Sequence, residues 1–287
     1  MKKPNSLFAL ILLLGFVFLS ENLVMTATAS EQELRSHYPV GRAKDYLTES
    51  EFNEVIYYLQ QLYAPEAMQK GNATLEINGF WNDDTFNAYA IRNDKKWNVS
   101  VFGGFARAEG MNKDAFALFV CHEIGHHLGG APLTYKFDGW PSAEGQADYW
   151  ATSKCLKRYY SFFSSQEFLV DEEIPKKAID DCGDVYYSSN EYRVCLRTMN
   201  AVKAFERVLN NLPNSKSSVS ILTPDKKQVK GTNNNDYPRP QCRLDTVYNG
   251  ALCYIEHNIL TTDREPRTGN CNELNKPGAR PLCWYKH

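Results

Sequence analysis

The stretch FVCHEIGHHLGGAP, residues 119–132, decides the fold because its apolar helical pattern carries three of the chain's six histidines. Residues four apart lie on one face of an α-helix, so His122 and His126 project side by side. Neutral imidazole is a good ligand for Zn²⁺, and Glu123, one position around the helix, can reach a water on that metal without binding it. The spacing His-Glu-x-x-His therefore predicts a zinc site with Glu123 as its general base.

The same stretch is predicted to form a core helix. Asn112 is a good N-cap, and Gly129-Gly130 is a good C-terminal stop. Apolar side chains cover most of the helix circumference, so the imidazole and carboxylate groups need partners inside the core, which favours a bound metal. His127 points about 100° away from His126. We expect His127 to be a packed or hydrogen-bonded neighbour of the site rather than a ligand.

Two histidines leave zinc short of one protein ligand. A metzincin pattern requires a third histidine at position 132, where the chain has Pro132. The better candidate is Glu144, in the helical pattern that Pro141-Ser142 opens. Asp148 stands four residues further on the same face, so one carboxylate can bind the metal while the other accepts a hydrogen bond from a ligand histidine.

The remaining patterns predict an α+β fold that is mostly helical with a small sheet. Thr48 and Glu51 are suited to a capping box at the start of the first helix. Helical periodicity occupies residues 52–59, 142–160 and 192–209, and short alternating runs predict strands at residues 75–80 and 97–102.

The second of these strands is the candidate substrate-binding edge. Peptide substrates often add as an extra strand along an exposed sheet edge. The residues assigned to this edge are Asn98, Val99, Ser100, Val101 and Phe102. An interior strand without substrate contact is the alternative.

The first 29 residues are predicted to be a cleaved secretory signal. Lys2 and Lys3 precede the apolar run Leu7–Leu19, and Ala27-Thr28-Ala29 offers the small residues that suit a signal peptidase. The apolar run falls short of the roughly 20 residues needed to span a bilayer. We therefore expect no membrane insertion after signal cleavage, and the short Lys-Lys signal indicates a bacterial protein that is periplasmic or secreted.

Composition limits the partners. The formal net charge is −2 and the chain has no basic tract, which argues against nucleic acid or an anionic membrane as partner. Eight cysteines in an exported chain predict disulfides formed in an oxidising compartment. We expect protein or peptide substrates and a monomeric protein.

The cysteines near the C-terminus are predicted to form two nested bridges. Cys242 and Cys253 lie eleven residues apart in an expected helix, which separates them by about 16 Å, beyond disulfide reach. A returning chain would instead join Cys253 to Cys271 and Cys242 to Cys283.

For the other four cysteines only one pairing is excluded. Cys155 lies three turns beyond Glu144 on the same helix face, and Glu144 should meet the metal beside His122. Cys155 is therefore expected to be too distant to bridge Cys121. The pairing is otherwise open among Cys121, Cys155, Cys182 and Cys195.

Two motifs resemble those of the HtpX, BepA and CAAX-prenyl-protease group of gluzincin metallopeptidases, in which His-Glu-x-x-His is followed by Glu-x-x-Ala-Asp. Residues 122–126 match the first motif and residues 144–148 match the second. Asn87-Ala88-Tyr89-Ala90 resembles the family's Asn-Ala-Phe-Ala stretch, and residues 237–244 resemble its downstream Thr-His-Pro-x-x-x-x-Arg segment. The resemblance covers about residues 50–250.

The resemblance implies a zincin-like metallopeptidase domain and a zinc-dependent endopeptidase. The ligands that it implies for one Zn²⁺ per chain are His122, His126 and Glu144. Asp148 and Arg243 would support these ligands. Tyr237, which stands where the family usually has histidine, is the first candidate for stabilising the oxyanion, followed by His257 and Arg243.

The chain shows neither the transmembrane helices nor the helical repeats of the family's branches, so their particular substrates do not carry over. After the signal we expect a zinc metallopeptidase domain at residues 30–210, a loop or lid segment at 211–240 and a cysteine-rich segment packed on the domain at 241–287. The alternative function is a catalytically silent exported protein with a structural zinc that binds partners through its cysteine-rich tail. A structural zinc usually has a fourth protein ligand and needs no base at Glu123, which favours the enzyme.

Overall fold

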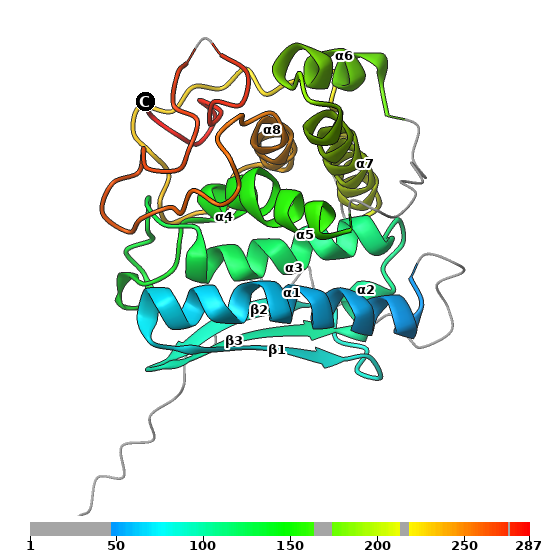
Figure 1. The fold of residues 1–287 in the computed structure, drawn as a ribbon, viewed down its shortest axis with the longest axis vertical. Helices are drawn as coiled ribbons and strands as arrows, with labels where there is room; N and C mark the ends of the chain where they lie inside the picture. Colours follow the sequence, from blue (N-terminus) through cyan, green and yellow to red (C-terminus); the bar gives the residue numbers. More distant parts are fainter. Residues whose placement is uncertain (1–46, 164–173, 213–217, 275) are drawn as a thin grey trace, which may run out of the picture.

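The computed structural model describes residues 47–163, 174–212, 218–274 and 276–287, so the predicted signal peptide lies outside the described residues. The predicted α+β fold with a small sheet is confirmed: helices predominate, and one three-stranded sheet lies on one side of them (Figure 1). The helices and strands are α1 Glu49–Gly71, β1 Thr74–Phe80, β2 Ala88–Asn93, β3 Lys96–Phe102, α2 Gly103–Ala106, α3 Lys113–Leu128, α4 Glu144–Trp150, α5 Leu156–Phe162, α6 Lys176–Val185, α7 Ser189–Asn211 and α8 Pro240–Ala251. A 3-10 turn, Phe137–Gly139, precedes α4, and a π-helical turn, η2, links α4 to α5 at Ala151–Cys155.

Helix α1 begins at the predicted capping box. The Thr48 hydroxyl accepts a hydrogen bond from the N–H of Glu51 at 3.2 Å, and the Glu51 carboxylate accepts one from the N–H of Thr48 at 2.9 Å. α1 and α3 lie together over one face of the sheet, and α4 and α8 follow in layers further from it (Figure 1). The sheet therefore supports α3, the helix that carries His122 and His126.

The sheet has the order β1-β3-β2, with β1 parallel and β2 antiparallel to β3. The prediction of an exposed edge at Asn98, Val99, Ser100, Val101 and Phe102 is wrong, because these residues belong to the central strand. β3 pairs with a neighbour on each side, so its backbone groups are used within the sheet. The edge strand on that side is β2, whose sequence AYAIRN alternates too weakly to be recognised as a strand.

Helix α3 is a core helix, as predicted. The Asn112 side chain caps it by accepting a hydrogen bond from the N–H of Ala115 at 2.9 Å. The chain turns away at Gly130, whose φ of +73° lies in the left-handed region that favours glycine. Nearly every side chain of the helix is buried. The polar groups of α3 therefore act in surroundings that contain little water.

The helical segment that starts with α4 runs antiparallel to α3. The N–H of Ser142 donates to the carbonyl of His126 at 3.0 Å, which ties the start of this segment to the end of α3. Gly125 lets the two helices approach closely, because a Cβ there would lie only 3.0 Å from the carbonyl oxygen of Ala147. This close approach allows the carboxylates of α4 to reach the histidines of α3.

Four disulfides join all eight cysteines. The predicted bridges Cys242–Cys283 and Cys253–Cys271 are confirmed, with Cα–Cα distances of 5.9 and 5.6 Å. Both fasten the C-terminal segment to α8 and the turn that follows it. The Cys182–Cys195 bridge joins α6 to α7.

The prediction that Cys155 cannot reach Cys121 is wrong, because the two form a disulfide with a Cα–Cα distance of 5.6 Å. The helices are in close contact at Gly125 and Ala147, between the position of Glu144 at the start of α4 and that of Cys155. The π turn that contains Cys155 also places more residues in each turn than an α-helix does. Cys155 is therefore rotated towards α3 and lies less far along the axis than α-helical spacing predicts.

Residues 218–239 have no regular secondary structure and run along the C-terminal segment; we call them the strap. The N–H of Val229 donates to the carbonyl of Leu282 at 2.9 Å, and the N–H of Asn233 donates to that of Trp284 at 2.8 Å. Trp284 is fully buried against Gly145 at the start of α4. The strap is thus held beside the helix that carries Glu144.

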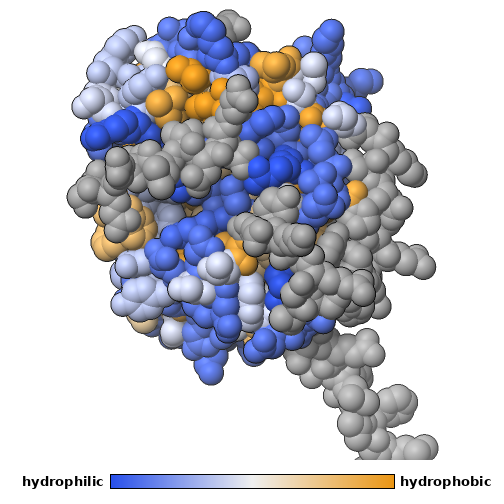
Figure 2. Space-filling view, turned by 90° about the vertical axis from the view of Figure 1, so that its right-hand side faces the viewer, coloured by the Kyte–Doolittle hydropathy of each residue, from blue (hydrophilic) through white to orange (hydrophobic). Residues whose placement is uncertain are grey.

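None of the described helices is both long enough and apolar enough to cross a membrane. Figure 2 shows the face at the right of Figure 1, where polar side chains cover most of the lower half and apolar side chains gather in a patch in the upper half.

Candidate metal centre

Helices α3 and α4 bring three metal-ligating side chains together. The ligand atoms of His122, His126 and Glu144 all lie within 4.8 Å of one another. His122 Nε2 lies 3.3 Å from Glu144 Oε2, and His126 Nε2 lies 3.7 Å from Glu144 Oε1. The two imidazole rings stand nearly perpendicular, with their centroids 4.7 Å apart. These are the three ligands that the sequence predicted, and the structure groups them as a possible metal site.

Both histidines are anchored through the ring nitrogen that faces away from Glu144. His122 Nδ1 lies 2.8 Å from Asp148 Oδ1, and His126 Nδ1 donates to the carbonyl of Ser142 at 2.9 Å. An oxygen at Nδ1 keeps a proton on that nitrogen, so that Nε2 carries the lone pair whenever the ring is neutral. Metal-ligating histidines are typically oriented in this way.

Several buried polar atoms of the site fit a bound cation. Three buried atoms of the site, His122 Nε2, Glu144 Oε2 and Glu123 Oε2, make no hydrogen bond of good geometry, although the first two lie 3.3 Å apart. Buried polar groups without partners are costly, and two of these atoms belong to the ligand set. A metal ion between the rings and the Glu144 carboxylate would satisfy both. The donor set of two imidazoles and one carboxylate therefore fits a metal.

Asp148 connects the site to α8. Arg243 donates two hydrogen bonds to the Asp148 carboxylate, from Nε and from the terminal Nη2, each at 2.7 Å. Burial would raise the pKa of Asp148, but Arg243 and His122 lower it well below its usual range. Asp148 thus stays ionised and holds the ring of His122. Because both of these donors bind Asp148, Arg243 supports the site indirectly: it holds the carboxylate that contacts His122.

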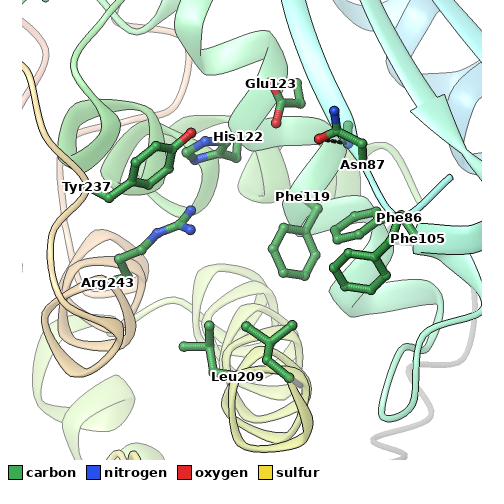
Figure 3. A pocket seen from close by; sticks show the side chains of 11 residues that line it. Phe86, Asn87, Phe105, Phe119, His122, Glu123, Leu209, Tyr237 and Arg243 are labelled. Carbon is green, nitrogen blue, oxygen red and sulfur yellow. Dashed lines mark hydrogen bonds between the residues drawn. The ribbon is translucent and has the colours of Figure 1, made fainter. Parts of the chain in front are cut away.

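Tyr237, on the strap, lies beside the ligand Glu144 and within hydrogen-bond reach of its carboxylate. Figure 3 shows its hydroxyl pointing towards His122 and its ring near Arg243, whose guanidinium carbon is 5.7 Å from the ring centroid. Burial, together with the charge of Glu144, raises the pKa of Tyr237 well above its usual value. The hydroxyl therefore keeps its proton and is a hydrogen-bond donor at neutral pH.

Glu123 follows His122 on α3 but does not belong to the ligand group. Its carboxyl is buried and lines a pocket beside the ligands together with Tyr237 (Figure 3). Burial raises the pKa of Glu123, although His122 and His126 partly offset this. A carboxylate with a raised pKa is a stronger base than one in water. Glu123 is thus suited to take up a proton at this place.

Two other candidate histidines lie away from the ligand group. His127 is stacked between Trp97 and Trp140, with centroid distances of 5.4 and 5.0 Å, and its Nε2 lies 3.1 Å from the carbonyl of Asn98. Its expected role as a packed neighbour is confirmed. His257 lines a different pocket, beside Lys157, and takes no part in the metal group.

Sequence patterns missed two features of the site. One is the carbonyl of Ser142, because a backbone group gives no signal in the sequence. The other is Phe119, which precedes His122 by three and Glu123 by four residues and so lies on their helix face. That spacing was visible in the sequence, but Phe119 was counted only as part of the apolar core.

No protein-family model, curated protein or solved structure matches the chain. The function is therefore argued from the chemistry of the site and from the motifs in the sequence.

Proposed function

We propose that the protein is an exported zinc-dependent endopeptidase with a zincin-like fold, related to the HtpX, BepA and CAAX-prenyl-protease group. The observation that carries this proposal is the convergence of His122, His126 and Glu144 beside the Glu123 carboxylate, whose Oε2 has no hydrogen-bond partner. Three protein ligands leave a fourth position open, as in catalytic zinc sites. A purely structural site would usually be closed by a fourth ligand.

Zinc suits this donor set better than the hard cations do. Mg²⁺ and Ca²⁺ prefer sites made of oxygen atoms, whereas two imidazoles and one carboxylate are typical of zinc. When bound, zinc supplies Lewis-acid polarisation of a peptide carbonyl and lowers the pKa of water to about 7. The ligands His122 and His126 must be neutral to bind it, and their anchored Nδ1 atoms favour that tautomer.

The chain's own residues would carry the proton transfers. Glu123 accepts the proton of the attacking water and then delivers it to the leaving amine. The Tyr237 hydroxyl donates a hydrogen bond to the oxyanion, because its raised pKa keeps it protonated. Asp148 and Arg243 hold His122 in place while charge develops nearby. The burial of Glu123 and Tyr237 and the contacts of Asp148 and Arg243 support these roles.

The edge strand β2 is the place where a peptide substrate would add to the sheet. Within the described part of the chain β2 pairs with β3 alone, so the outward backbone groups of alternate residues have no strand partner there. Asn87 and Ala88, at its start, line the pocket that contains Glu123. A peptide bound in an extended form along β2 would therefore pass the metal centre. This replaces the central strand β3 as the expected binding edge.

Export is supported by the four disulfides, which form in oxidising compartments. The alternative of a silent protein that binds partners through its tail is less well supported. The four cysteines of the tail region are buried in bridges and pack around Tyr149 of α4. The tail thus contributes to the support of the metal-bearing helix.

The test of the proposed function is cleavage of an unfolded protein such as casein. We expect the zinc-loaded protein to cleave it, a chelator to stop cleavage, and added zinc to restore it. The Glu123→Gln variant should bind zinc but not cleave. Zinc-loaded protein that leaves casein and mixed peptide libraries intact, or a Glu123→Gln variant as active as the wild type, would contradict the proposal.

A further inference from the structure

A second pocket, distinct from the one at the metal centre, lies between α5, the start of α7 and the segment that follows α8. Lys157, Tyr186 and His257 contribute polar groups to its lining, and Val194 and Ile255 contribute apolar walls. The residues that line it belong neither to the metal group nor to the pocket beside that group. The second pocket is therefore a separate candidate site.

The amino group of Lys157 is buried in this pocket among uncharged partners. Only 6 % of the residue is exposed. Its Nζ donates to the Tyr186 hydroxyl at 2.6 Å and to the carbonyl of Cys253 at 2.5 Å. The Tyr186 hydroxyl in turn donates to the same carbonyl at 2.8 Å, and burial raises the pKa of Tyr186 well above its usual value. Tyr186 thus keeps its proton and supplies no negative charge to Lys157.

Two other cations near Lys157 are bound to groups outside the pocket. The Lys154 Nζ donates to the carbonyl of Glu256 at 2.7 Å, and Arg158 Nη1 lies 3.0 Å from Glu66 Oε2. The carbonyl contacts of the two lysines fasten the segment after α8 to the helix that carries them. A carbonyl has no net charge, so these contacts explain the packing of the lysines but leave the charge of Lys157 without a counter-ion.

The electrostatic surroundings of Lys157 confirm that a counter-ion is missing. Burial, reinforced by the charge of Lys154, lowers the pKa of Lys157 well below its usual value. Glu191, on the exposed first turn of α7, offsets this only in part, and among the described residues Lys157 forms no ion pair with a carboxylate. Burial and the nearby cations also lower the pKa of His257. A buried amine in such a place either stays neutral or pairs with an anion from outside.

A single carboxylate on an apolar body is the anion that fits the lining. A lysine ammonium has three donors, and two of those of Lys157 are used within the protein. The third can donate to a carboxylate oxygen, while Val194 and Ile255 pack against the apolar part of the ligand. Glu191 and Glu256 also line the pocket. Their charges would repel a dianion such as a phosphate group more strongly than a monoanion.

We propose that this pocket binds a small organic carboxylate, which pairs with the Lys157 ammonium and packs its apolar part against Val194 and Ile255. Free carboxylic acids and the C-terminal residues of peptides both offer this chemistry. Because the ligand supplies the missing negative charge, Lys157 takes up a proton when the ligand binds. The proposal goes beyond the proposed function and does not depend on it, since no residue of the pocket takes part in the metal site.

The test is isothermal titration calorimetry of the zinc-loaded full chain with three ligands. Isocaproate is a free acid, N-acetyl-leucine resembles the C-terminus of a peptide, and N-acetyl-leucinamide is its uncharged counterpart. We expect at least one acid to bind, and the amide to bind at least about tenfold more weakly than N-acetyl-leucine or not at all. Binding of isocaproate alone identifies a free acid as the ligand, and binding of N-acetyl-leucine alone identifies a peptide C-terminus. Failure of both acids to bind, or equal binding of the amide, overturns the proposal.

Two variants locate the binding site. Lys157→Met removes the amine but keeps the apolar stem, and Ile255→Asp places a negative charge on the wall. Each should weaken binding of the acid at least about tenfold. The matched controls are Lys176→Met, at an 84 % exposed side chain, and Ile259→Asp, at a 48 % exposed residue, neither of which lines the pocket. Unchanged affinity in Ile255→Asp overturns the assignment even if Lys157→Met does not fold.

Two further measurements exclude other sites for the acid. Zinc also binds carboxylates, so the titration is repeated with Glu144→Ala. Retained affinity in this variant supports the pocket, whereas loss of binding places the ligand on the metal and overturns the proposal. Titrations in buffers of different ionisation enthalpy count the protons taken up. Proton uptake that disappears in Lys157→Met supports the pairing, and equal uptake in both proteins assigns the proton to another group, such as Lys154 or His257, and overturns it.

Discussion

Asp148 Oδ1 lies 2.8 Å from Nδ1 of His122, and the same carboxylate accepts two hydrogen bonds from Arg243. Asp148 on α4 thus fixes the ring of His122 on α3. Arg243 on α8 in turn fixes the Asp148 carboxylate. The candidate metal centre therefore depends on three helices, of which only α3 and α4 carry the proposed ligands.

Metal affinity should distinguish Glu144 from Asp148. Glu144→Ala removes a ligand and should abolish stoichiometric zinc binding. Asp148→Asn removes only the charge that orients His122 and should weaken zinc binding by about 10 to 100-fold. Competitive titration against a chromophoric chelator measures both. If Glu144→Ala binds zinc as tightly as the wild type, Glu144 is not the third ligand.

Replacement of Glu123 should stop peptide cleavage without removing zinc. Glu123→Gln keeps the size of the side chain and does not touch the ligand group, so we expect full zinc content and a loss of turnover by at least about 10²-fold. Glu273→Gln, at a surface position, is the matched control and should behave as the wild type. Zinc content and peptide turnover are measured on the same samples. Loss of zinc from Glu123→Gln would mean that its role is misassigned.

Tyr237→Phe should lower kcat by about 10²-fold with little change in KM, because it removes one oxyanion donor. The ring packing near Arg243 is kept in this variant, so its zinc affinity should not change. Steady-state kinetics with a peptide substrate provides the measurement. An increase in activity would instead indicate that the Tyr237 hydroxyl blocks the open metal position. Unchanged kinetics would mean that only the ring of Tyr237 matters, through packing.

As the pH rises, the stability of the metal-free protein should fall, whereas its affinity for zinc should rise. Burial alone would lower the pKa of His122, but Asp148 and Glu144 outweigh it and raise this pKa to about 10 in the metal-free protein. A histidine whose pKa is raised by folding stabilises the protein fully below its unfolded pKa of about 6.5 and loses that contribution as the pH rises through the folded value. Metal-free protein should therefore lose stability between about pH 6.5 and 10. Zinc needs neutral imidazole, so zinc affinity should rise over the same range. Thermal unfolding with chelator and zinc titrations across this range test both trends, and parallel trends would contradict the assignment.

The Cys121–Cys155 bridge should matter for the metal as well as for stability. It closes a loop of 34 residues next to His122, and its removal should cost about 3 to 4 kcal/mol of unfolding free energy. Removal of Cys182–Cys195, which spans 13 residues far from the ligands in sequence, should cost about 3 kcal/mol. We expect only the double variant Cys121→Ala/Cys155→Ala to weaken zinc binding. Equal zinc affinity in both double variants would show that the bridge does not position His122.

The parts of the fold that follow from local sequence could be predicted. Asn112 and Gly130 bound α3, and His122 and His126 share a face, because capping and helical periodicity act over a few residues. Glu144 could be assigned from its spacing to Asp148. These predictions rest on short-range geometry. Helix length also excluded a Cys242–Cys253 bridge, and the two nested bridges that a returning chain could form are the ones found.

The parts that depend on packing between distant segments could not be predicted. The π turn at Cys155 changes the register of a helix without a sequence signal, so the bridge to Cys121 was excluded wrongly. The order of the sheet depends on which strands pair, and an apparent edge at Val99 proved to be central. The pocket next to Glu123 is lined by residues from the start of β2, α2, α3, the end of α7, the strap and α8, which only the folded chain brings together.

The most direct measurement is X-ray absorption at the zinc K-edge of the zinc-loaded protein, compared with Glu144→Ala. We expect one zinc per chain, coordinated by nitrogen and oxygen at about 2.0 to 2.2 Å, with the outer scattering of two imidazoles and no sulfur at about 2.3 Å. Glu144→Ala should lose this signal. Sulfur ligation, a single imidazole, or an identical spectrum in Glu144→Ala would contradict a zinc centre formed by His122, His126 and Glu144.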